Sequence, residues 1–149
     1  MEKTIRLAEG KDLDKIQAFL GDLDKSGIEK GVEYYLIVED NKGEIIGTSG
    51  IQTFEKIGLL RSLVLTNASA EEILYLLQQT IQLAKDKELE RLYCMINNKN
   101  AIQLFTLLGF KEIVKAELPV VLKTSDVVKN ISTVNNPIFM YYSIGNVDN

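Results

Sequence analysis

Asn98-Lys99-Asn100-Ala101-Ile102-Gln103-Leu104-Phe105-Thr106-Leu107-Leu108-Gly109-Phe110 is the most informative stretch of this 149-residue chain. It follows the apolar run 91–96, which predicts a strand. Asn98 is suited to cap the start of a helix, and Gly109 is suited to the left-handed position that ends one. Apolar residues at i, i+3, i+4 and i+7 give the segment one helical face: Ala101, Leu104, Phe105 and Leu108. The sequence therefore predicts a strand, a capped helix over 98–108, and a second strand after Phe110.

Hydrophobic periodicity predicts the elements that precede this segment. Alternating or continuous apolar runs, with turn formers around 40–43, predict four strands: 4–8, 35–38, 45–49 and 58–65. A helical period predicts one helix whose apolar face holds Leu13, Ile16, Leu20 and Leu23, with Asp12 as its N-cap. A second, longer helix is expected from about Ala70 to Lys87.

The chain is expected to close with two strands, over 111–117 and 138–144, and with a loop or short helix that contains Pro119 and Pro137 between them. The resulting order β-α-β-β-β-α-β-α-β-β predicts the α/β class. We expect one mixed central sheet of about 6–7 strands, flanked by helices on both faces. No linker or repeat interrupts the pattern, so 1–149 is expected to form a single domain.

Composition excludes several kinds of function. Hydrophobic residues make up 46% and charged residues 26%, as in globular proteins, and no apolar run reaches membrane-spanning length. The net charge is −4 and the basic residues are scattered, so nucleic acid and membranes are not expected partners. The single cysteine, Cys94, fits inert packing in a reducing cytoplasm. Histidine is absent, which removes the commonest general base and zinc ligand.

Two segments resemble one known family. Leu60-Arg61-Ser62-Leu63-Val64-Leu65 is similar to the fourth strand of the GNAT N-acetyltransferases, and Asn98–Phe110 is similar to their fourth helix. Gly58–Val64 also resembles the arsenic-operon-associated and amino-acid acetyltransferase branch, as do Leu118-Pro119 and Asn136-Pro137. The resemblance implies a GNAT-like fold and an acyl-CoA site. In such a site a bulge in strand four frees backbone groups, which bind the pantetheine arm of acetyl-CoA.

The resemblance also implies which residues bind the cofactor. Backbone contacts are expected from 63–65, and a hydrogen bond to the cofactor arm from the side chain of Asn98. The full set of expected cofactor-binding residues is Leu63, Val64, Leu65, Asn98, Ala101 and Phe105. The structural alternatives are an ordinary buried strand for 63–65 and a simple helix N-cap for Asn98.

The loop before the long helix departs from the family pattern. Family members carry glycines and a basic residue there, which close around the pyrophosphate. Here 66–73 contains neither, and Ser69 followed by Glu72 fits a capping box instead. Glu71 and Glu72 would also repel a pyrophosphate. We therefore expect a self-capped helix rather than a phosphate-binding loop.

The catalytic acid and base also depart from the family pattern. Phe105 occupies the position of the tyrosine that protonates the departing thiolate, and phenylalanine cannot donate a proton. Tyr141 is the candidate acid, and Tyr142 and Tyr93 are the other phenols near the expected sheet. Glu55, near the end of the third strand, is the candidate base, and Glu33, at the start of the second strand, is the next choice. Packing and solvated surface positions are the structural alternatives for these residues.

Three functions follow from these expectations. The first is an acetyl-CoA-dependent N-acetyltransferase whose partner is a small-molecule amine or amino-acid-like acceptor. The second is a catalytically degenerate GNAT-fold protein that acts as a ligand-binding or interaction module. The third is a docking domain whose exposed C-terminal strand pairs with a partner or with a second copy of itself. A homodimer is one option, since the proteins that the chain resembles often share C-terminal strands.

Overall fold

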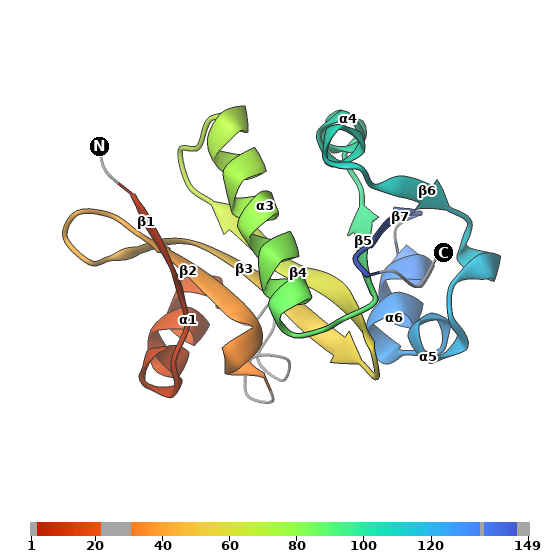
Figure 1. Cartoon of the computed structure of the whole chain (residues 1–149), viewed down its shortest axis with the longest axis horizontal. Helices are drawn as coiled ribbons and strands as arrows, with labels where there is room; N and C mark the ends of the chain where they lie inside the picture. The colour runs from red at the N-terminus through yellow and green to blue at the C-terminus, as the bar shows by residue number, and fades with distance from the viewer. Residues whose placement is uncertain (1–2, 22–30, 135, 146–149) are drawn as a thin grey trace. The chain divides into compact units, whose positions relative to one another are not determined.

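The structure is a computed structural model that describes residues 3–21, 31–134 and 136–145 (Figure 1). Within these residues the strands are β1 (Thr4–Leu7), β2 (Tyr35–Glu39), β3 (Ile45–Phe54), β4 (Ile57–Leu65), β5 (Arg91–Ile96), β6 (Lys111–Ile113) and β7 (Ile138–Ser143). The helices are α1 (Leu13–Leu20), α3 (Ala70–Asp86), α4 (Lys99–Leu108), α5 (Val120–Lys123) and α6 (Asp126–Val134). Short 3-10 turns lie at Gly10–Asp12, Val32–Tyr34 and Lys115–Glu117.

The strands form a seven-stranded sheet in the order β1-β2-β3-β4-β5-β7-β6. β4 and β5 are parallel, whereas β1–β2, β2–β3, β5–β7 and β6–β7 are antiparallel pairs. The predicted α/β fold with a mixed sheet is therefore confirmed. β7 lies between β5 and β6, so the expectation of an exposed C-terminal strand is wrong. Chain order does not fix spatial order, and the edge strands of this sheet are β1 and β6.

The chain divides into two compact units, one of residues 1–52 with 60–83 and one of 53–59 with 84–149. β3 and β4 each contribute residues to both units. The single domain over 1–149 stays a prediction.

In the first unit, helices cover both faces of the strands. Ile37 of β2 packs in a buried cluster with Ile16 and Leu20 of α1. Ile37 is paired with Thr48 of β3, so the next residue of β3, Ser49, points to the other face. There the Ser49 hydroxyl lies 2.7 Å from the hydroxyl of Thr80 in α3. Because successive strand residues point to opposite faces, α1 and α3 cover opposite sides of these strands.

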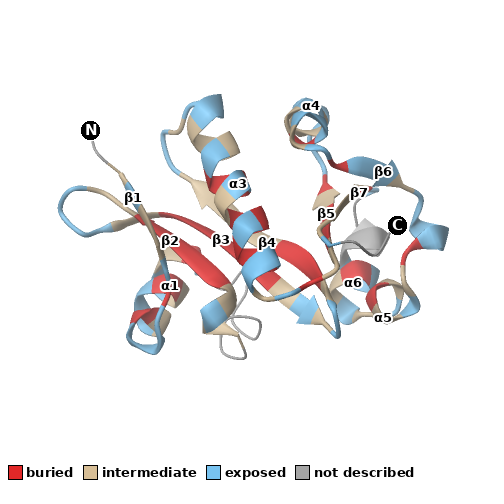
Figure 2. Cartoon of the chain, viewed as in Figure 1, coloured by how far each residue is buried: buried red, intermediate tan, exposed pale blue. Residues whose placement is uncertain are grey.

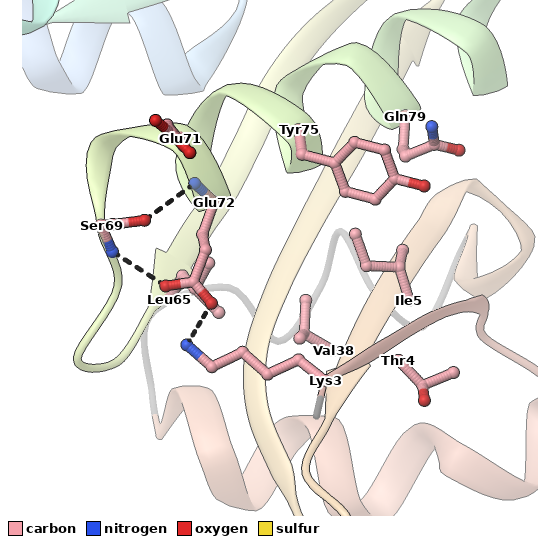
Figure 3. Close-up of a pocket in the computed structure, with 10 residues that line it drawn as sticks. All are labelled: Lys3, Thr4, Ile5, Val38, Leu65, Ser69, Glu71, Glu72, Tyr75 and Gln79. Atoms are coloured by element: carbon pink, nitrogen blue, oxygen red, sulfur yellow. Dashed lines mark hydrogen bonds and ion pairs between the residues drawn. The ribbon is translucent and has the colours of Figure 1, made fainter. Parts of the chain in front are cut away.

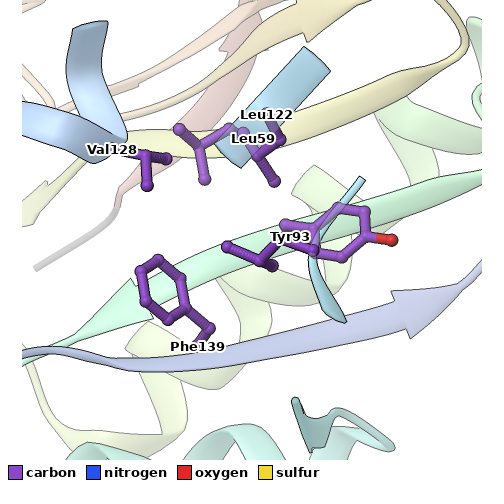
Figure 4. Packing of buried hydrophobic residues seen from close by; sticks show 6 residues of the cluster. Leu59, Tyr93, Leu122, Val128 and Phe139 are labelled. Carbon is purple, nitrogen blue, oxygen red and sulfur yellow. The ribbon is translucent and has the colours of Figure 1, made fainter. Parts of the chain in front are cut away.

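The second unit has the same two-sided arrangement. Tyr93 of β5 packs with Leu122 of α5, Val128 of α6 and Phe139 of β7 (Figure 4). In β7, Tyr141 is paired with Tyr93 and shares its face, so the next residue, Tyr142, points to the opposite face. There the Tyr142 ring contacts Phe110, which follows α4. Helices α5 and α6 therefore pack on one face of these strands, and α4 lies on the other. Figure 2 marks the buried positions of α5 and α6 in red.

Several local predictions are confirmed by the structure. α4 begins after Asn98 and ends at Gly109, whose φ of 106° is left-handed as expected. β5 spans Arg91–Ile96 and α3 spans Ala70–Asp86, within one residue of their predicted ends. Cys94 is buried, and burial raises the pKa of its thiol, which fits an inert packing role.

Other local predictions need correction. β6 ends at Ile113 rather than residue 117, because the chain turns at Lys115–Glu117 and buries Leu118 in the α5–α6 cluster. The expected loop or short helix after it contains two helices, α5 and α6. Leu23, expected on the face of α1, lies outside the described residues. Among those described, no helix is both long and apolar enough to cross a membrane.

Asp12 precedes α1 but does not cap it through its side chain. Its buried carboxylate accepts two hydrogen bonds of 2.8 Å from the Arg6 guanidinium and one of 2.9 Å from the Glu9 backbone N–H. Arg6 also bonds Glu39 of β2 at 2.9 Å. This ion triad fixes the segment before α1 to β1 and β2.

Replacing Asp12 tests this triad. We expect Asp12→Asn to lower the free energy of unfolding by about 2 kcal/mol at neutral pH, because a charge-assisted bond to Arg6 is lost. Asp14→Asn, at an exposed position of the same helix, is the control and should change stability by less than about 0.5 kcal/mol. Urea denaturation measures both, and equal losses in the two variants would refute the role of the triad.

The same variant predicts a pH dependence. The Arg6 hydrogen bonds lower the pKa of Asp12 from 3.8 to about 2. A lowered carboxyl pKa means that the stabilisation is complete above the unfolded value and is lost as pH falls through the folded one. The difference between wild type and Asp12→Asn should therefore be full above about pH 4 and disappear near pH 2.

Candidate functional site

β4 contains a backbone irregularity at Ser62. This residue has φ of 55°, in the left-handed region that non-glycine residues rarely adopt inside a strand. The buried Thr48 of β3 donates its hydroxyl hydrogen to the Ser62 carbonyl at 2.7 Å. After the irregularity, the Thr66 backbone N–H and hydroxyl both donate hydrogen bonds to the Ile46 carbonyl, at 3.0 and 3.1 Å. The expected break in the fourth strand is therefore present, and side chains of the first unit hold it.

The parallel pairing of β4 with β5 is short. Its register joins Ile57 to Arg91, Gly58 to Leu92 and Leu59 to Tyr93, all within the second unit. β4 itself continues to Leu65. Residues 63–65, predicted to contact a cofactor through their backbone, follow the Ser62 irregularity and are half-buried in the first unit.

The start of α3 is capped by its own side chains, as predicted. The Glu72 backbone N–H donates to the Ser69 hydroxyl at 3.2 Å, and the Ser69 N–H donates to the Glu72 carboxylate at 2.9 Å. Lys3, which precedes β1, forms an ion pair of 2.7 Å with the other Glu72 oxygen (Figure 3). The Lys3 ammonium, followed by the Ser69 N–H, lowers the pKa of Glu72.

A pocket of about 590 Å³ lies beside this capped end (Figure 3). Its apolar floor comes from β1, β2 and the end of β4, and its polar wall comes from α3. The lining residues are Lys3, Thr4, Ile5, Val38, Leu65, Ser69, Glu71, Glu72, Tyr75 and Gln79. Two carboxylates against one ammonium make its lining net negative. These residues do not fit a pyrophosphate, which needs free N–H groups and positive charge.

Asn98 and Ala101 begin α4 in the second unit. The Asn98 side-chain oxygen accepts the N–H of Asn100 at 2.9 Å, and its backbone carbonyl accepts that of Ala101 at 3.0 Å. The structural alternative for Asn98, a helix N-cap, is thus confirmed. The cap uses the side-chain oxygen, so the exposed amide nitrogen is positioned to donate to a ligand.

Phe105 lies in the core of the second unit with 4% of its surface exposed. Its ring packs edge-on against Phe110, with centroids 5.0 Å apart, and Phe110 contacts Tyr142 at 5.4 Å. This packing explains why a phenylalanine suits the position. Any cofactor contact by Phe105 stays a prediction.

Tyr141, the candidate acid, belongs to the opposite face of the second unit. It pairs with Tyr93 in the β5–β7 register, and the Arg91 guanidinium lies 4.9 Å from its ring centroid. Arg91 also donates to the Tyr93 hydroxyl at 3.3 Å. Together with Glu112–Val114 and Glu117, Arg91 and Tyr141 line a pocket of about 440 Å³.

Glu55, the candidate base, is exposed in the turn between β3 and β4, where its φ is 59°. It precedes the paired end of β4, since the β4–β5 register starts at Ile57 and stops at Leu59. The structure brings Asn98, Ala101 and Phe105 together through α4 but places Tyr141 on the other face of that unit. Residues 63–65 belong to the other unit, and Glu55 lies at a turn. In the described residues no cluster of potential metal ligands occurs.

Sequence reasoning missed two residues that shape the site. Thr48 holds the Ser62 carbonyl, and the polar run Gly47–Gly50 inside an apolar strand was the available signal. Lys3 neutralises Glu72, but no local pattern in the sequence joins residues so far apart.

Comparisons with known proteins agree with this architecture. No family model matches the chain. The chain is 32% identical over 114 residues to YwlB of Bacillus subtilis (strain 168), an uncharacterised protein, and the match covers 72% of the chain and 76% of YwlB.

Solved structures share the fold. N-acetylglutamate synthase from Neisseria gonorrhoeae, complexed with coenzyme A and N-acetyl-glutamate, matches 97% of the chain with a TM-score of 0.75 and 19% identity. The chain spans only 36% of that protein. Rv2747 from Mycobacterium tuberculosis, in complex with CoA, has a TM-score of 0.74 and 14% identity over 95% of the chain and 99% of Rv2747. A GNAT-family acetyltransferase of Staphylococcus aureus has a TM-score of 0.69 and 17% identity over 97% of the chain and 100% of that protein. The fold is the GNAT fold.

The hydrogen bond that holds the irregularity can be tested with Thr48→Val. We expect the free energy of unfolding to fall by about 1 kcal/mol, because the hydrogen bond between the Thr48 hydroxyl and the Ser62 carbonyl is lost. Thr53→Val, at an exposed position of the same strand, is the matched control and should be nearly neutral. Denaturant titration measures both, and a neutral Thr48→Val would mean that Ser62 holds its conformation without this bond.

Proposed function

The chain belongs to the family of YwlB, and we propose that it is an acetyl-CoA-dependent N-acetyltransferase acting on a small amine or an amino-acid-like acceptor. The observation that carries the proposal is the left-handed Ser62 in β4, after a β4–β5 pairing that ends at Leu59. The GNAT fold supports it, as do two structural neighbours whose structures are complexes with coenzyme A. Since the chain spans about a third of the synthase, the substrates of that protein are no guide by themselves.

In this proposal the donor is bound by the residues that the resemblance implies. The backbone of 63–65, after the Ser62 irregularity, would bind the amides of the pantetheine arm. The Asn98 side-chain nitrogen would donate a hydrogen bond to the arm, and Ala101 and Phe105 would make apolar contacts with it. An extended ligand with two amide groups suits a strand edge, because it repeats the hydrogen-bonding pattern of a strand.

Bound acetyl-CoA would supply a thioester whose acetyl group passes to the amine nitrogen, so that a C–N bond forms and the C–S bond breaks. A backbone N–H among 63–65 polarises the carbonyl oxygen. Glu55 is the proposed base for the amine proton, and Tyr141 the proposed acid for the thiolate. Glu55 would take up the amine proton directly or through water.

The remaining expectations belong to the same proposal. Residues 1–149 would act as one domain whose partner is the small-molecule amine, without nucleic acid or membrane. The proposal also includes a homodimer and a cytoplasmic location. The buried thiol of Cys94 suits a reducing compartment but does not define one.

One observation favours the second candidate, a catalytically degenerate ligand-binding or interaction module. The self-capped start of α3, with Lys3 bound to Glu72, leaves no phosphate-binding loop where the family has one. Binding of the donor separates the two candidates, because a module that has lost the donor site has no reason to bind CoA.

Calorimetric titration with CoA tests the proposal. We expect saturable binding near micromolar Kd, about −8 kcal/mol, with the pantetheine arm as the main contact. Asn98→Asp should keep the helix cap and the stability, because aspartate also accepts the Asn100 N–H, but should weaken CoA binding about tenfold by losing the amide donor. No heat at millimolar CoA would refute the proposal.

The control separates capping from binding. Asn98→Ala removes both the cap and the amide donor, so it should lose about 1 kcal/mol of stability as well as CoA affinity. If Asn98→Asp binds CoA as tightly as wild type, the Asn98 side chain serves the helix alone.

Substituting the two aromatic positions tests the acid. CoA release is measured over a panel of amino acids and aliphatic amines. Tyr141→Phe should lower turnover about 100-fold without changing CoA affinity, as expected for a general acid. Phe105→Tyr should leave the rate of the wild type unchanged if Tyr141 is the donor. A rise with Phe105→Tyr, together with no loss in Tyr141→Phe, would show that the acid position is vacant.

A further inference from the structure

The start of α3 combines a closed hydrogen-bond cap with a net negative pocket. We propose that the chain recognises its acyl donor through the pantetheine arm and gains no affinity from the nucleotide end, so that pantetheine thioesters without a nucleotide serve as donors as well as acetyl-CoA does. This inference rests on the proposed function and concerns the donor of the same reaction.

Hydrogen bonding at the start of α3 leaves little for a phosphate. The Glu72 N–H is bound to the Ser69 hydroxyl, the Ile73 N–H to the Ser69 carbonyl and the Ser69 N–H to the Glu72 carboxylate. A carboxylate thus already occupies the position where a helix N-terminus attracts an anion. A phosphate would have to displace Glu72, which is covalently present at a high effective concentration.

Charge acts in the same direction. The only ammonium among the lining residues is Lys3, and it lies 2.7 Å from Glu72 with 15% of its side chain exposed. Glu71 adds a second, exposed carboxylate to the same wall (Figure 3). Moving a doubly charged pyrophosphate toward this wall is unfavourable, and the repulsion weakens as salt is added.

The loop before α3 is also fixed against rearrangement. Thr66 is bound to the Ile46 carbonyl by both its N–H and its hydroxyl. Asn67 has φ of 50°, so this non-glycine residue adopts the left-handed conformation of the tight turn. The Thr66 N–H could donate to a phosphate only by breaking its bond to the Ile46 carbonyl.

The chemistry of transfer does not need the nucleotide. An amine nitrogen forms a C–N bond with the acetyl carbon, the C–S bond breaks, and the pantetheine sulfur leaves as a thiol after taking up a proton. The amine loses one proton, so atoms and charge balance with acetylpantetheine as with acetyl-CoA. Only binding can distinguish the two donors.

The experiment compares three ligands by calorimetry on the whole chain: CoA, pantetheine, and 3′-phosphoadenosine 5′-phosphate as the nucleotide fragment. We expect CoA and pantetheine to bind within about threefold of one another and the nucleotide to give no heat at millimolar concentration. CoA affinity should stay constant or rise with salt. Turnover with S-acetylpantetheine should likewise match that with acetyl-CoA.

The outcomes separate the inference from the proposed function. If CoA binds 100-fold or more tightly than pantetheine, or if the nucleotide binds alone, the inference is overturned and the proposed function stands. If neither CoA nor pantetheine binds, the proposed function itself fails and the inference with it.

A charge variant adds an internal check. Glu72→Gln keeps an acceptor for the Ser69 N–H but releases Lys3, and Glu71→Lys reverses the second charge. The double variant should bind CoA about tenfold more tightly, with affinity that falls as salt is added, while its pantetheine affinity stays unchanged. Glu44→Gln, an exposed carboxylate that lines a different pocket, is the matched control and should leave both affinities as in wild type. An unchanged CoA affinity in the double variant would overturn the electrostatic part of the inference.

Discussion

The left-handed conformation of Ser62 is the constraint on which the candidate site depends. A regular parallel strand commits every backbone N–H and C=O to its neighbours, and such a strand offers a ligand nothing. With φ of 55° at Ser62, the strand changes course, and the Ser62 carbonyl accepts the hydroxyl hydrogen of the buried Thr48. This hydrogen bond is one interaction that supports the left-handed serine. Backbone strain of this kind is concentrated at functional sites, because only selection for function retains it.

The second constraint is that a helix N-terminus can be used only once. At the start of α3 the Glu72 N–H donates to the Ser69 hydroxyl and the Ser69 N–H donates to the Glu72 carboxylate, whose charge is paired with Lys3. The same groups would be needed to bind a phosphate. Helix capping and phosphate binding therefore compete for the same groups at this helix. In this structure those groups cap the helix. For the proposed ligand CoA, the irregularity in β4 would favour binding of the pantetheine arm, whereas the helix cap would disfavour binding of the pyrophosphate.

Patterns local in sequence were predictable, and contacts between distant residues were not. Asn98, Gly109 and the Ser69–Glu72 box each act within a few residues, so spacing alone identified them. The position of β7 between β5 and β6 depends on pairing across the sheet, and the helices α5 and α6 are stabilised by burial of Leu122 and Val128 rather than by propensity. For the site, residue types and element ends were predictable. Three features of the site could not be predicted, because they depend on contacts between residues far apart in the sequence. These are the Thr48 hydroxyl that supports Ser62, the Lys3 ammonium that binds Glu72, and the sheet face to which Tyr141 belongs.

The missing tyrosine at Phe105 matters less to an acetyl transfer than the lack of a strong base does. A thiol has an ordinary pKa of about 8.5, so a departing thiolate needs little protonation near neutral pH. An aliphatic amine like that of lysine, with a pKa of about 10.4, is almost entirely protonated and must lose that proton before it can attack. An α-amino group has a pKa of about 7.7–8.0 and is partly neutral already. Without histidine, and with Glu55 at an exposed turn, the proposed transferase would need an acceptor that requires little deprotonation. For that proposed reaction, acid–base chemistry would favour an amino-acid-like α-amine over a polyamine or a lysine side chain.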